Sequence, residues 1–130
     1  MKTNPTIFIA DDDQEDITLL RESLIERNAM VNCLTFHNGL VLINFLLTNT
    51  ETVPDLITLD INMPIKNGFL TLHELKQNPL LKSIPVIMLS TSKRPEDEAR
   101  SLQMGCLSFF TKPTSVSEYT TIAERILLLC

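Results

Sequence analysis

The chain has 130 residues, of which 44% are hydrophobic and 21% are charged, and its formal net charge is −5. This size and composition predict a single globular domain with one core, and the negative charge argues against a nucleic-acid surface. No apolar run approaches the ~20 residues of a membrane span and no signal peptide is recognisable, so we expect a cytoplasmic protein that binds neither nucleic acid nor membrane.

Short apolar runs alternate with segments of helical periodicity along the whole chain. The first run, Thr6 to Ala10, predicts a strand that stops at three aspartates. A helix is predicted over 14–28, with Asp13 as its N-cap, and Glu15 and Asp16 are expected only to suit the positive end of its dipole. The other elements are strands at 30–36, 56–59, 86–89 and 107–110, and helices at 40–47, 68–76, 96–104 and 115–128.

This alternation predicts a doubly wound α/β fold. Strands that alternate with helices form a parallel sheet covered on both faces, because right-handed crossovers carry each helix over the sheet. In such folds ligands bind outside the carboxyl ends of the strands. The search for a functional site therefore begins with the residues that follow each predicted strand.

Polar side chains stand at four of these strand ends. Asp60 follows an apolar run that predicts a strand buried on both faces, where a charge needs compensation. Carboxylates ~4 Å apart repel by about 4 kcal/mol at an effective dielectric near 20, so an oxygen-rich cluster predicts Mg²⁺ or Mn²⁺. Such a carboxylate can attack phosphorus while an amine and a hydroxyl contact the phosphoryl oxygens. The residues are Asp11 and Asp12 after the first strand, Asp60 after the third, Ser90 at the fourth and Lys112 after the fifth.

Four motifs carry a resemblance to a known family. They are the acidic pair Asp11-Asp12, the DINMPIKNG segment around Asp60, the VIMLS segment ending at Ser90, and the FFTKP segment around Lys112. In this order and at these spacings the chain resembles the receiver domain of two-component response regulators, over about residues 5–128. The resemblance implies a flavodoxin-like sheet of five parallel strands in the order 2-1-3-4-5. It also implies a single receiver domain over 1–130, without an output domain.

The resemblance assigns a role to each residue of the predicted site. It implies that Asp60 accepts a phosphoryl group and that Lys112 binds that group. A divalent cation, Mg²⁺ with Mn²⁺ as a substitute, would be held by Asp12, Asp60 and the backbone carbonyl of Asn62, with Asp11 acting through a metal-bound water. The remaining assignments are Ser90 as the switch hydroxyl, Phe109 as the switch aromatic, and a cis peptide bond before Pro113.

The resemblance also implies partners. The phosphoryl donor would be a sensor histidine kinase or a histidine phosphotransfer protein, and output would come from partner binding, dimerisation or relay. The polar loop at 48–53 and the segment NPLLKSIPVIMLSTS resemble single-domain receivers that partner phytochrome-type kinases. In the last helix, Val116 belongs to the expected core face, whereas Leu127, Leu128 and Leu129 widen the apolar surface. We therefore expect a partner or homodimer patch on the face of the fourth and fifth helices and the fifth strand.

Two rival functions remain to be weighed. A metal-dependent phosphohydrolase with an aspartyl nucleophile usually has a second acid two residues further on, where this chain has Asn62. A degenerate receiver that binds partners without phosphorylation is disfavoured by the complete acidic set and by Lys112. The prediction is therefore a signalling receiver that catalyses only its own phosphorylation and dephosphorylation, and not an enzyme acting on other substrates.

Several reactive or polarisable side chains are assigned no functional role. His37 and His73 are isolated from the carboxylates and from each other, so we expect them to be structural or exposed. Cys33 and Cys106 are expected in the core, and an odd number of widely spaced cysteines favours free thiols over disulfides or a zinc site. The methionines expected to serve in packing are Met30, Met63, Met88 and Met104.

Overall fold

The computed structural model describes residues 2–130 and forms one sheet of five parallel strands in the order β2-β1-β3-β4-β5. The predicted alternation of strands and helices and the predicted strand order are both confirmed. The strands are β1 (Thr6–Ala10), β2 (Asn32–Phe36), β3 (Leu56–Leu59), β4 (Val86–Ser90) and β5 (Ser108–Thr111). The helices are α1 (Gln14–Arg27), α2 (Gly39–Thr48), α3 (Gly68–Gln77), α4 (Pro95–Gln103) and α5 (Val116–Leu129).

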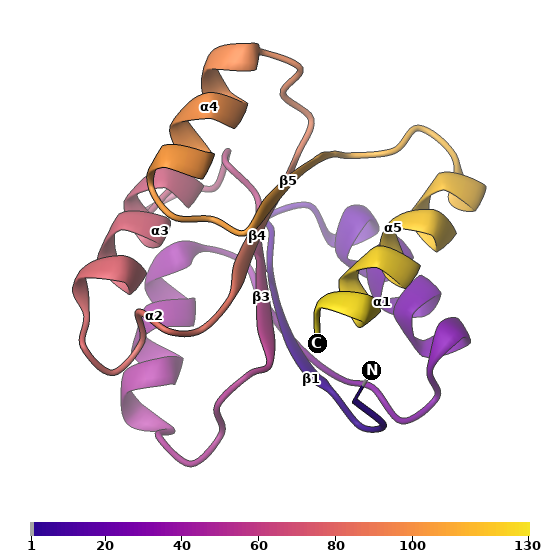
Figure 1. Cartoon of the computed structure of the whole chain (residues 1–130), viewed down its shortest axis with the longest axis horizontal. Coiled ribbons are helices and arrows are strands. Elements are labelled where there is room, and N and C mark those ends of the chain that lie inside the picture. The colour runs from indigo at the N-terminus through magenta and orange to yellow at the C-terminus, as the bar shows by residue number, and fades with distance from the viewer. Residues whose placement is uncertain (1) are drawn as a thin grey trace.

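The sheet divides the apolar interior into two clusters. Helices α1 and α5 cover one face, and α2, α3 and α4 lie on the other (Figure 1). Successive strand residues point to opposite faces, so Phe8 and Ala10 pack toward α2 and α3 while Ile7 and Ile9 pack toward α1 and α5. Because the central strands β3 and β4 are covered on both faces, every one of their residues is buried, as the continuous apolar runs predict.

Helix α4 is the element held least firmly by apolar burial. Its sequence PEDEARSLQ is largely polar, and Ser101 is its only buried residue. Instead, the Arg100 guanidinium lies over the Phe69 ring of α3, 4.0 Å from the ring centroid. Such a cation–π contact contributes only about 0.5–1 kcal/mol at an exposed site. Helix α4 therefore depends on polar contacts and on its connections to β4 and β5.

Most predictions about individual residues agree with the structure, but those for three apolar residues are wrong. Leu127 was expected to widen an exposed apolar surface, yet it is 1% exposed because it packs in the cluster that α1 and α5 share. Val116 was expected in the core, yet it is 65% exposed because it occupies the first position of α5, beyond the edge of the sheet. Met30 was expected to pack, but it is 68% exposed because it lies in the turn before β2 begins. His37 and His73 are exposed as expected.

Apart from Met30, the sulfur-containing residues that the structure describes follow the expected pattern. The cysteines are free thiols: Cys106 is buried, whereas Cys33 and Cys130 are partly buried. Met63 and Met88 lie in the cluster between the sheet and helices α2 and α3. No helix in the described range 2–130 is both long enough and apolar enough to span a bilayer.

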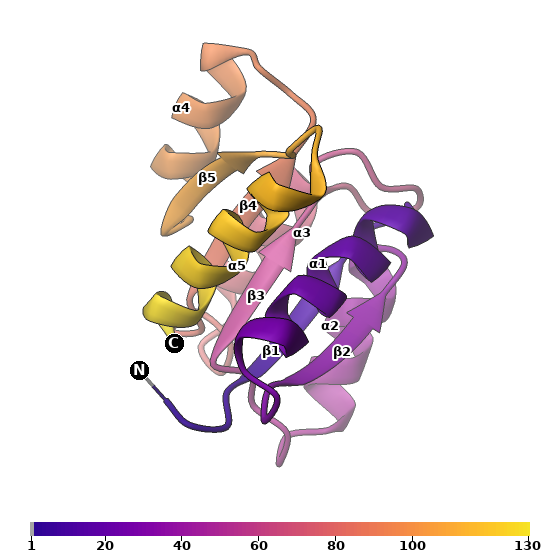
Figure 2. The ribbon, with the colours of Figure 1, turned by 90° about the vertical axis from the view of Figure 1, so that its right-hand side faces the viewer.

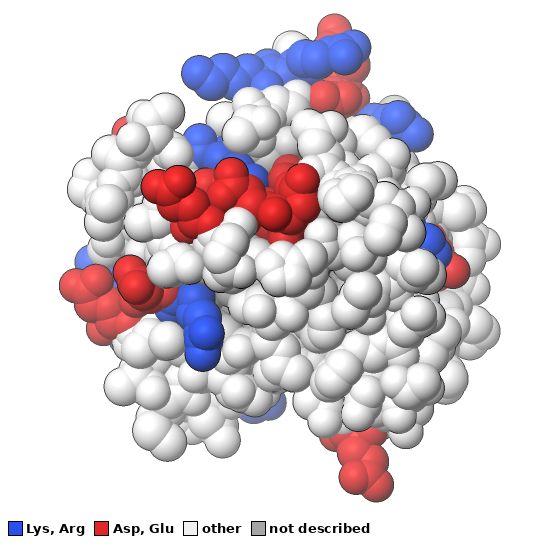
Figure 3. All heavy atoms as spheres, turned by 180° about the vertical axis from the view of Figure 1, so that it is seen from behind, with Lys and Arg blue, Asp and Glu red and all other residues white. Residues whose placement is uncertain are grey.

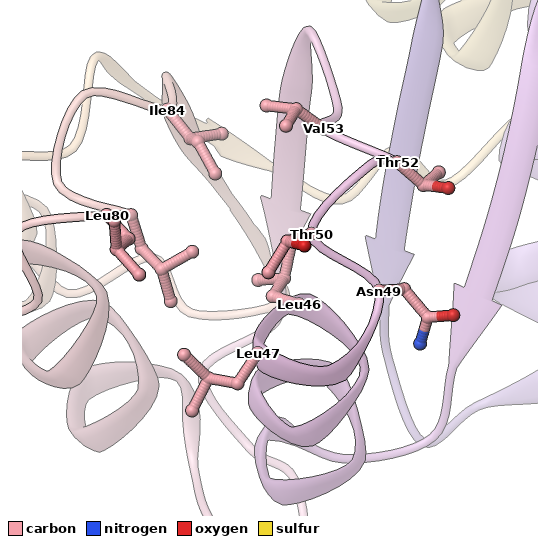
Figure 4. A pocket seen from close by; sticks show the side chains of 9 residues that line it. Leu46, Leu47, Asn49, Thr50, Thr52, Val53, Leu80 and Ile84 are labelled. Carbon is pink, nitrogen blue, oxygen red and sulfur yellow. The ribbon is translucent and has the colours of Figure 1, made fainter.

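The amino ends of the strands carry an apolar hollow of about 130 Å³. It lies between the end of α2, the α2–β3 loop and the α3–β4 loop (Figure 4). Its walls contain no ionisable side chain; they are formed by Leu46, Leu47, Asn49, Thr50, Thr52, Val53, Leu80, Leu81 and Ile84. This hollow therefore offers no side chain for proton transfer or cation binding, and the predicted site lies at the opposite edge of the sheet.

Candidate metal centre and phosphoryl site

Backbone hydrogen bonds hold the predicted site residues at the carboxyl edge of the sheet. The Asp60 N–H donates to the Ala10 carbonyl over 3.0 Å, which places Asp60 beside the residues that follow β1. The Lys112 N–H donates to the Ser90 carbonyl over 2.7 Å, which ties the end of β5 to the end of β4. Each residue is thus fixed by the strand before it, and the parallel arrangement brings all of them together.

The acidic residues form one cluster. Asp11, Asp12 and Asp60 each offer a carboxylate oxygen, and these oxygens lie within 4.8 Å of one another. Asp11 and Asp60 are only 5% exposed, whereas Asp12 is open to solvent. Seen from behind, acidic side chains gather in a band across the upper part of the molecule, with basic atoms beside it (Figure 3). Burying two carboxylates next to a third requires a compensating positive charge.

Lys112 supplies that charge. Its ammonium lies 2.7 Å from Asp11 Oδ2, 2.7 Å from Asp16 Oδ2 and 3.2 Å from Asp60 Oδ2. The Lys112 side chain is only 5% exposed, so these ion pairs are poorly screened by water. The ammonium donates hydrogen bonds to Asp16 Oδ2 and Asp60 Oδ2, and it forms an ion pair with Asp11.

The protonation of these groups reflects their surroundings. Burial, reinforced by the nearby Asp60 charge, raises the pKa of Asp11 from 3.8 to about 7, even though Lys112 and the Asp13 N–H act in the opposite direction. Burial alone would lower the pKa of Lys112, but its hydrogen bonds to Asp11 and Asp16 outweigh this and raise that pKa. One buried lysine therefore stays charged, yet it does not fully compensate the acids around it.

The residues present fit a divalent cation. Asp60 Oδ1 is buried and has no hydrogen-bond partner among residues 2–130, so one oxygen of the cluster is left for a ligand. All three side-chain donors are carboxylate oxygens, which Mg²⁺ and Mn²⁺ prefer, and the exposed Asp12 leaves one side open to water. The cluster thus has the donors and the excess negative charge of a divalent-metal site.

The other predicted residues surround this cluster. Ser90 is fully buried, and its hydroxyl oxygen accepts a hydrogen bond from the Ser92 N–H at 3.2 Å. Phe109 is partly buried against the α2/α3 side of the core. Asn62 is exposed two residues after Asp60, and the role of its carbonyl as a metal ligand stays a prediction.

The prediction of a cis peptide bond before Pro113 is wrong. All peptide bonds in residues 2–130 are trans. The trans form of an X–Pro bond is favoured by about 0.5–1 kcal/mol. With this bond trans, Lys112 already reaches the Ser90 carbonyl through its backbone and the carboxylates through its ammonium, so its contacts do not require the cis form.

Asp16 was expected to serve only the helix dipole, and this interpretation is incomplete. Its Oδ2 pairs with Lys112, and its Oδ1 accepts a hydrogen bond from the Tyr119 hydroxyl over 3.4 Å. As predicted, Asp13 caps α1, because its side chain accepts hydrogen bonds from the backbone N–H groups of Glu15 and Asp16. A helical signal for Asp16 was available, because it stands four residues before the buried Leu20 and so shares its inward face.

The loop after Asp60 is shaped by close backbone contacts. The Gly68 N–H donates to the Ile61 carbonyl over 2.8 Å, and Asn67 caps α3 through its side chain. A Cβ at Gly68 would collide with the Asp60 carbonyl oxygen and lie 2.8 Å from the Ile61 Cα. Because these atoms are backbone, they can give way only if the segment carrying Asp60 moves.

We expect Gly68→Ala to lower the free energy of unfolding by about 1–3 kcal/mol and to weaken Mg²⁺ binding as well. Gly105→Ala is the matched control, because Gly105 has a φ of 103° but ordinary contact distances around a Cβ. It should cost about 1–2 kcal/mol of stability through backbone strain and leave Mg²⁺ binding unchanged. Urea unfolding and calorimetric Mg²⁺ titration measure both effects. Equal Mg²⁺ affinities in the two variants would contradict this account of the loop.

Comparison with known proteins places this geometry in a family. Residues 7–124 match the response regulator receiver domain family. Response regulator Rcp1 from Synechocystis sp. is 31% identical over 131 residues, which cover 96% of this chain and 89% of Rcp1. Other curated relatives are longer, and the chain spans 24%, 50% and 16% of three of them.

Solved structures give the same picture. The phosphorylated cyanobacterial phytochrome response regulator RcpA is 32% identical, with a TM-score of 0.88 and coverage of 95% of this chain and 91% of RcpA. The Mn²⁺-bound form of Rcp1 is 29% identical, with a TM-score of 0.84 and coverage of 94% and 91%. A divalent cation bound in a similar protein agrees with the donors of the acidic cluster in this chain.

Proposed function

The chain belongs to the response regulator receiver family of two-component signalling, and from this premise we propose that it accepts a phosphoryl group on Asp60. The observation that carries the proposal is the place of the Lys112 ammonium. It lies 3.2 Å from Asp60 Oδ2 and 2.7 Å from Asp11 Oδ2, at the edge where the strands end. A nucleophilic carboxylate, a fixed ammonium and a divalent-metal site in one place are the parts that phosphoryl transfer to an aspartate requires.

Asp11, Asp12 and Asp60 would hold Mg²⁺, with the Asn62 carbonyl as a further ligand and Mn²⁺ as a substitute. The unpartnered Oδ1 of buried Asp60 supports this assignment. When bound, the cation neutralises the carboxylates and stabilises negative charge on phosphoryl oxygens. Asp12, the exposed member of the cluster, keeps the site open to water and to a phosphoryl donor.

The chain's own residues then perform the transfer. A carboxylate oxygen of Asp60 attacks the phosphorus of a phosphohistidine or a small phosphodonor. With phosphohistidine, a new O–P bond forms as the N–P bond breaks, and the leaving imidazole takes up a proton from solvent. With acetyl phosphate, the new O–P bond forms as the O–P bond to the acetyl group breaks, and acetate leaves. Lys112 donates to one phosphoryl oxygen. The Ser90 hydroxyl, which only accepts from Ser92 N–H in this structure, still has its proton to donate to another.

The phosphorylated state would act through Ser90, Phe109 and α4. Movement of the Ser90 hydroxyl toward the phosphate would draw the β4–α4 loop with it. Phe109 lines a hollow of about 170 Å³ together with Ser92 and Pro95, so its ring has space to change position. Helix α4, with one buried residue, is the element that can shift at least cost in apolar burial.

The proposed donor is a sensor histidine kinase or a histidine phosphotransfer protein. The similarity to Rcp1 and RcpA supports a kinase of the phytochrome type. The chain matches 89% of the length of Rcp1. We propose that the phosphorylated receiver domain acts through a partner or a second copy bound at α4, β5 and α5. Leu128 on α5 is 69% exposed and would belong to this surface.

The test is to treat the purified protein with acetyl phosphate, with Mg²⁺ or with EDTA, and to measure its intact mass. We expect one added phosphoryl group with Mg²⁺ and none with EDTA. Hydroxylamine should remove the group, since acyl phosphates are labile to it, and peptide mapping should locate it at Asp60. Absence of any mass gain with Mg²⁺ would overturn the proposal. Continuous release of phosphate from a stable phosphomonoester would instead favour a hydrolase.

A further inference from the structure

Asp16 is a fourth carboxylate at the site but not a member of the acidic cluster. It lies in the first turn of α1, and its Oδ2 is 2.7 Å from the Lys112 ammonium, as close as Asp11 Oδ2. The cluster that could hold a cation consists of Asp11, Asp12 and Asp60 only. Lys112 therefore has two kinds of partner: Asp11 and Asp60, which belong to the acidic cluster, and Asp16, which does not.

Asp16 is itself held from a second side. The Tyr119 hydroxyl donates to Asp16 Oδ1 over 3.4 Å, and Tyr119 is 2% exposed in the core between α1 and α5. The two helices run alongside each other on the same face of the sheet (Figure 2). The Asp16 carboxylate is thus held at one oxygen by Lys112 over 2.7 Å and, more weakly, at the other by Tyr119 over 3.4 Å.

We propose that Asp16, oriented by Tyr119, is a positioning residue that keeps the Lys112 ammonium anchored while its contacts with Asp11 and Asp60 are exchanged. The exchange of contacts rests on the proposed function, whereas the anchor is present before any ligand binds. A bound divalent cation would take over the compensation of Asp11 and Asp60 but not of Asp16. The ammonium can then give up one cluster carboxylate for a phosphoryl oxygen without losing its last fixed partner.

The anchor also affects cation binding. Without Asp16, the only carboxylates left for Lys112 are those of the cluster, so the ammonium would lie deeper among them and compete with the cation. Asp16→Asn should therefore weaken Mg²⁺ binding through Lys112. Loss of any negative charge near the site would also weaken Mg²⁺ binding, and the test must separate the two effects.

Glu15 offers the matched control. It is an exposed acid in the same first turn of α1, one residue away, and it carries the same charge. Glu15→Gln removes an equal charge and an equal interaction with the helix dipole, but no contact with Lys112. A double-mutant cycle with Lys112→Met then isolates the part of the effect of Asp16 on Mg²⁺ affinity that depends on the Lys112 ammonium.

The first measurement is Mg²⁺ affinity by calorimetry. We expect Asp16→Asn to weaken binding by about tenfold in the natural background and by less than about twofold beside Lys112→Met, a coupling of the size found for residues in contact. Tyr119→Phe should act in the same direction but less strongly, and Glu15→Gln should have less than about a twofold effect. Equal losses from Asp16→Asn in both backgrounds, or an equal loss from Glu15→Gln, would overturn the proposal.

The second measurement needs no cation. Tyr119 is the single tyrosine of a chain without tryptophan, so tyrosine emission reports on it alone. In EDTA, a carboxylate hydrogen-bonded to the phenol should quench this emission. We expect Asp16→Asn to relieve the quenching, Lys112→Met to alter it and Glu15→Gln to leave it unchanged. Emission that is indifferent to Asp16 and Lys112 would overturn the linkage.

These outcomes are distinct from those that test phosphorylation. Coupling between Asp16 and Lys112 in a protein that never gains a phosphoryl group would reject the proposed function and keep the anchor. Phosphorylation at Asp60 without such coupling would keep the proposed function and reject the anchoring role of Asp16.

Discussion

Replacing Lys112 by methionine is expected to lower the free energy of unfolding of the metal-free protein by about 3–5 kcal/mol at pH 8, the usual cost of breaking a buried ion pair by removing one partner. The substitution keeps a side chain of similar length but leaves the buried Asp11 and Asp60 without a cation. Mg²⁺ should restore much of the loss, because it compensates the same carboxylates. Urea unfolding in EDTA and in Mg²⁺ measures both parts.

Protonation gives this prediction a pH dependence. The folded-state pKa of Asp11, about 7, lies above its ordinary 3.8, so folding takes up a proton between these values. The contribution of Asp11 to metal-free stability should therefore fall as the pH rises through that window, and the cost of losing Lys112 should be greatest above it. At pH 5, where Asp11 is neutral, Lys112→Met should be less damaging.

Arg27→Met is the control for the loss of a positive charge. Arg27 pairs with Glu124 at 2.7 Å between α1 and α5, and both side chains are more than 40% exposed, at 44% and 49%. An exposed ion pair contributes about 0–1 kcal/mol, so Arg27→Met should lower the free energy of unfolding by no more than this. Mg²⁺ should not restore the lost stability. If both variants lost the same stability, the buried ammonium would not be compensating the acidic cluster.

Asp60→Asn is expected to abolish phosphorylation altogether. An amide of the same shape is not a nucleophile toward phosphorus. Asp11 would not replace Asp60 as the acceptor, because it is held by the Lys112 ammonium and the Asp13 N–H. Asp12 would not replace it either, because its side chain is exposed to solvent. The fold should be retained, since Lys112 keeps Asp11 and Asp16 as partners. Intact mass after treatment with acetyl phosphate and Mg²⁺ should remain that of the untreated variant.

Asp55→Asn tests the same change at the other end of β3. Asp55 pairs with Lys2 and accepts from the Thr6 N–H over 2.8 Å, and an asparagine can still accept that bond. This variant should be phosphorylated as the natural protein is. A phosphorylated Asp60→Asn protein would instead move the acceptor to a different residue.

The fold could be predicted from the sequence because local signals and topology agree. Continuous apolar runs predicted strands buried on both faces, and the structure buries every residue of β3 and β4. Leu127 was expected at the surface but is buried, and the two opposite failures occur where an apolar residue lies beyond the packed elements. Val116 continues the periodicity of α5 but stands before the first turn that packs, and Met30 extends the apolar pattern of β2 into a turn. Hydrophobic periodicity does not record where the partner surface ends.

The candidate site could be predicted from its place at the strand ends. Helical periodicity also places its fourth carboxylate, Asp16, on the inward face of α1, but the partners of Asp16 could not be predicted. Asp11, Asp60 and Lys112 each follow a strand, and a parallel sheet brings such residues together. Asp16 lies in a helix, where an acid near the N-terminus has a sufficient explanation in the dipole. Its contact with Lys112 depends on how α1 crosses the sheet, and its contact with Tyr119 on how α1 meets α5. These are tertiary facts that no single segment of the chain contains.

The division of the interior by the sheet has a consequence for redesign of this protein. The cluster under α2 and α3 shares no side chain with the cluster under α1 and α5, where Tyr119 is buried. Changes in volume on one side should therefore add to changes on the other wherever the altered side chains lie more than about 7–10 Å apart and share no partner. The α2/α3 half can be rebuilt for greater thermal tolerance while the half that carries the anchor of Lys112 keeps its natural packing.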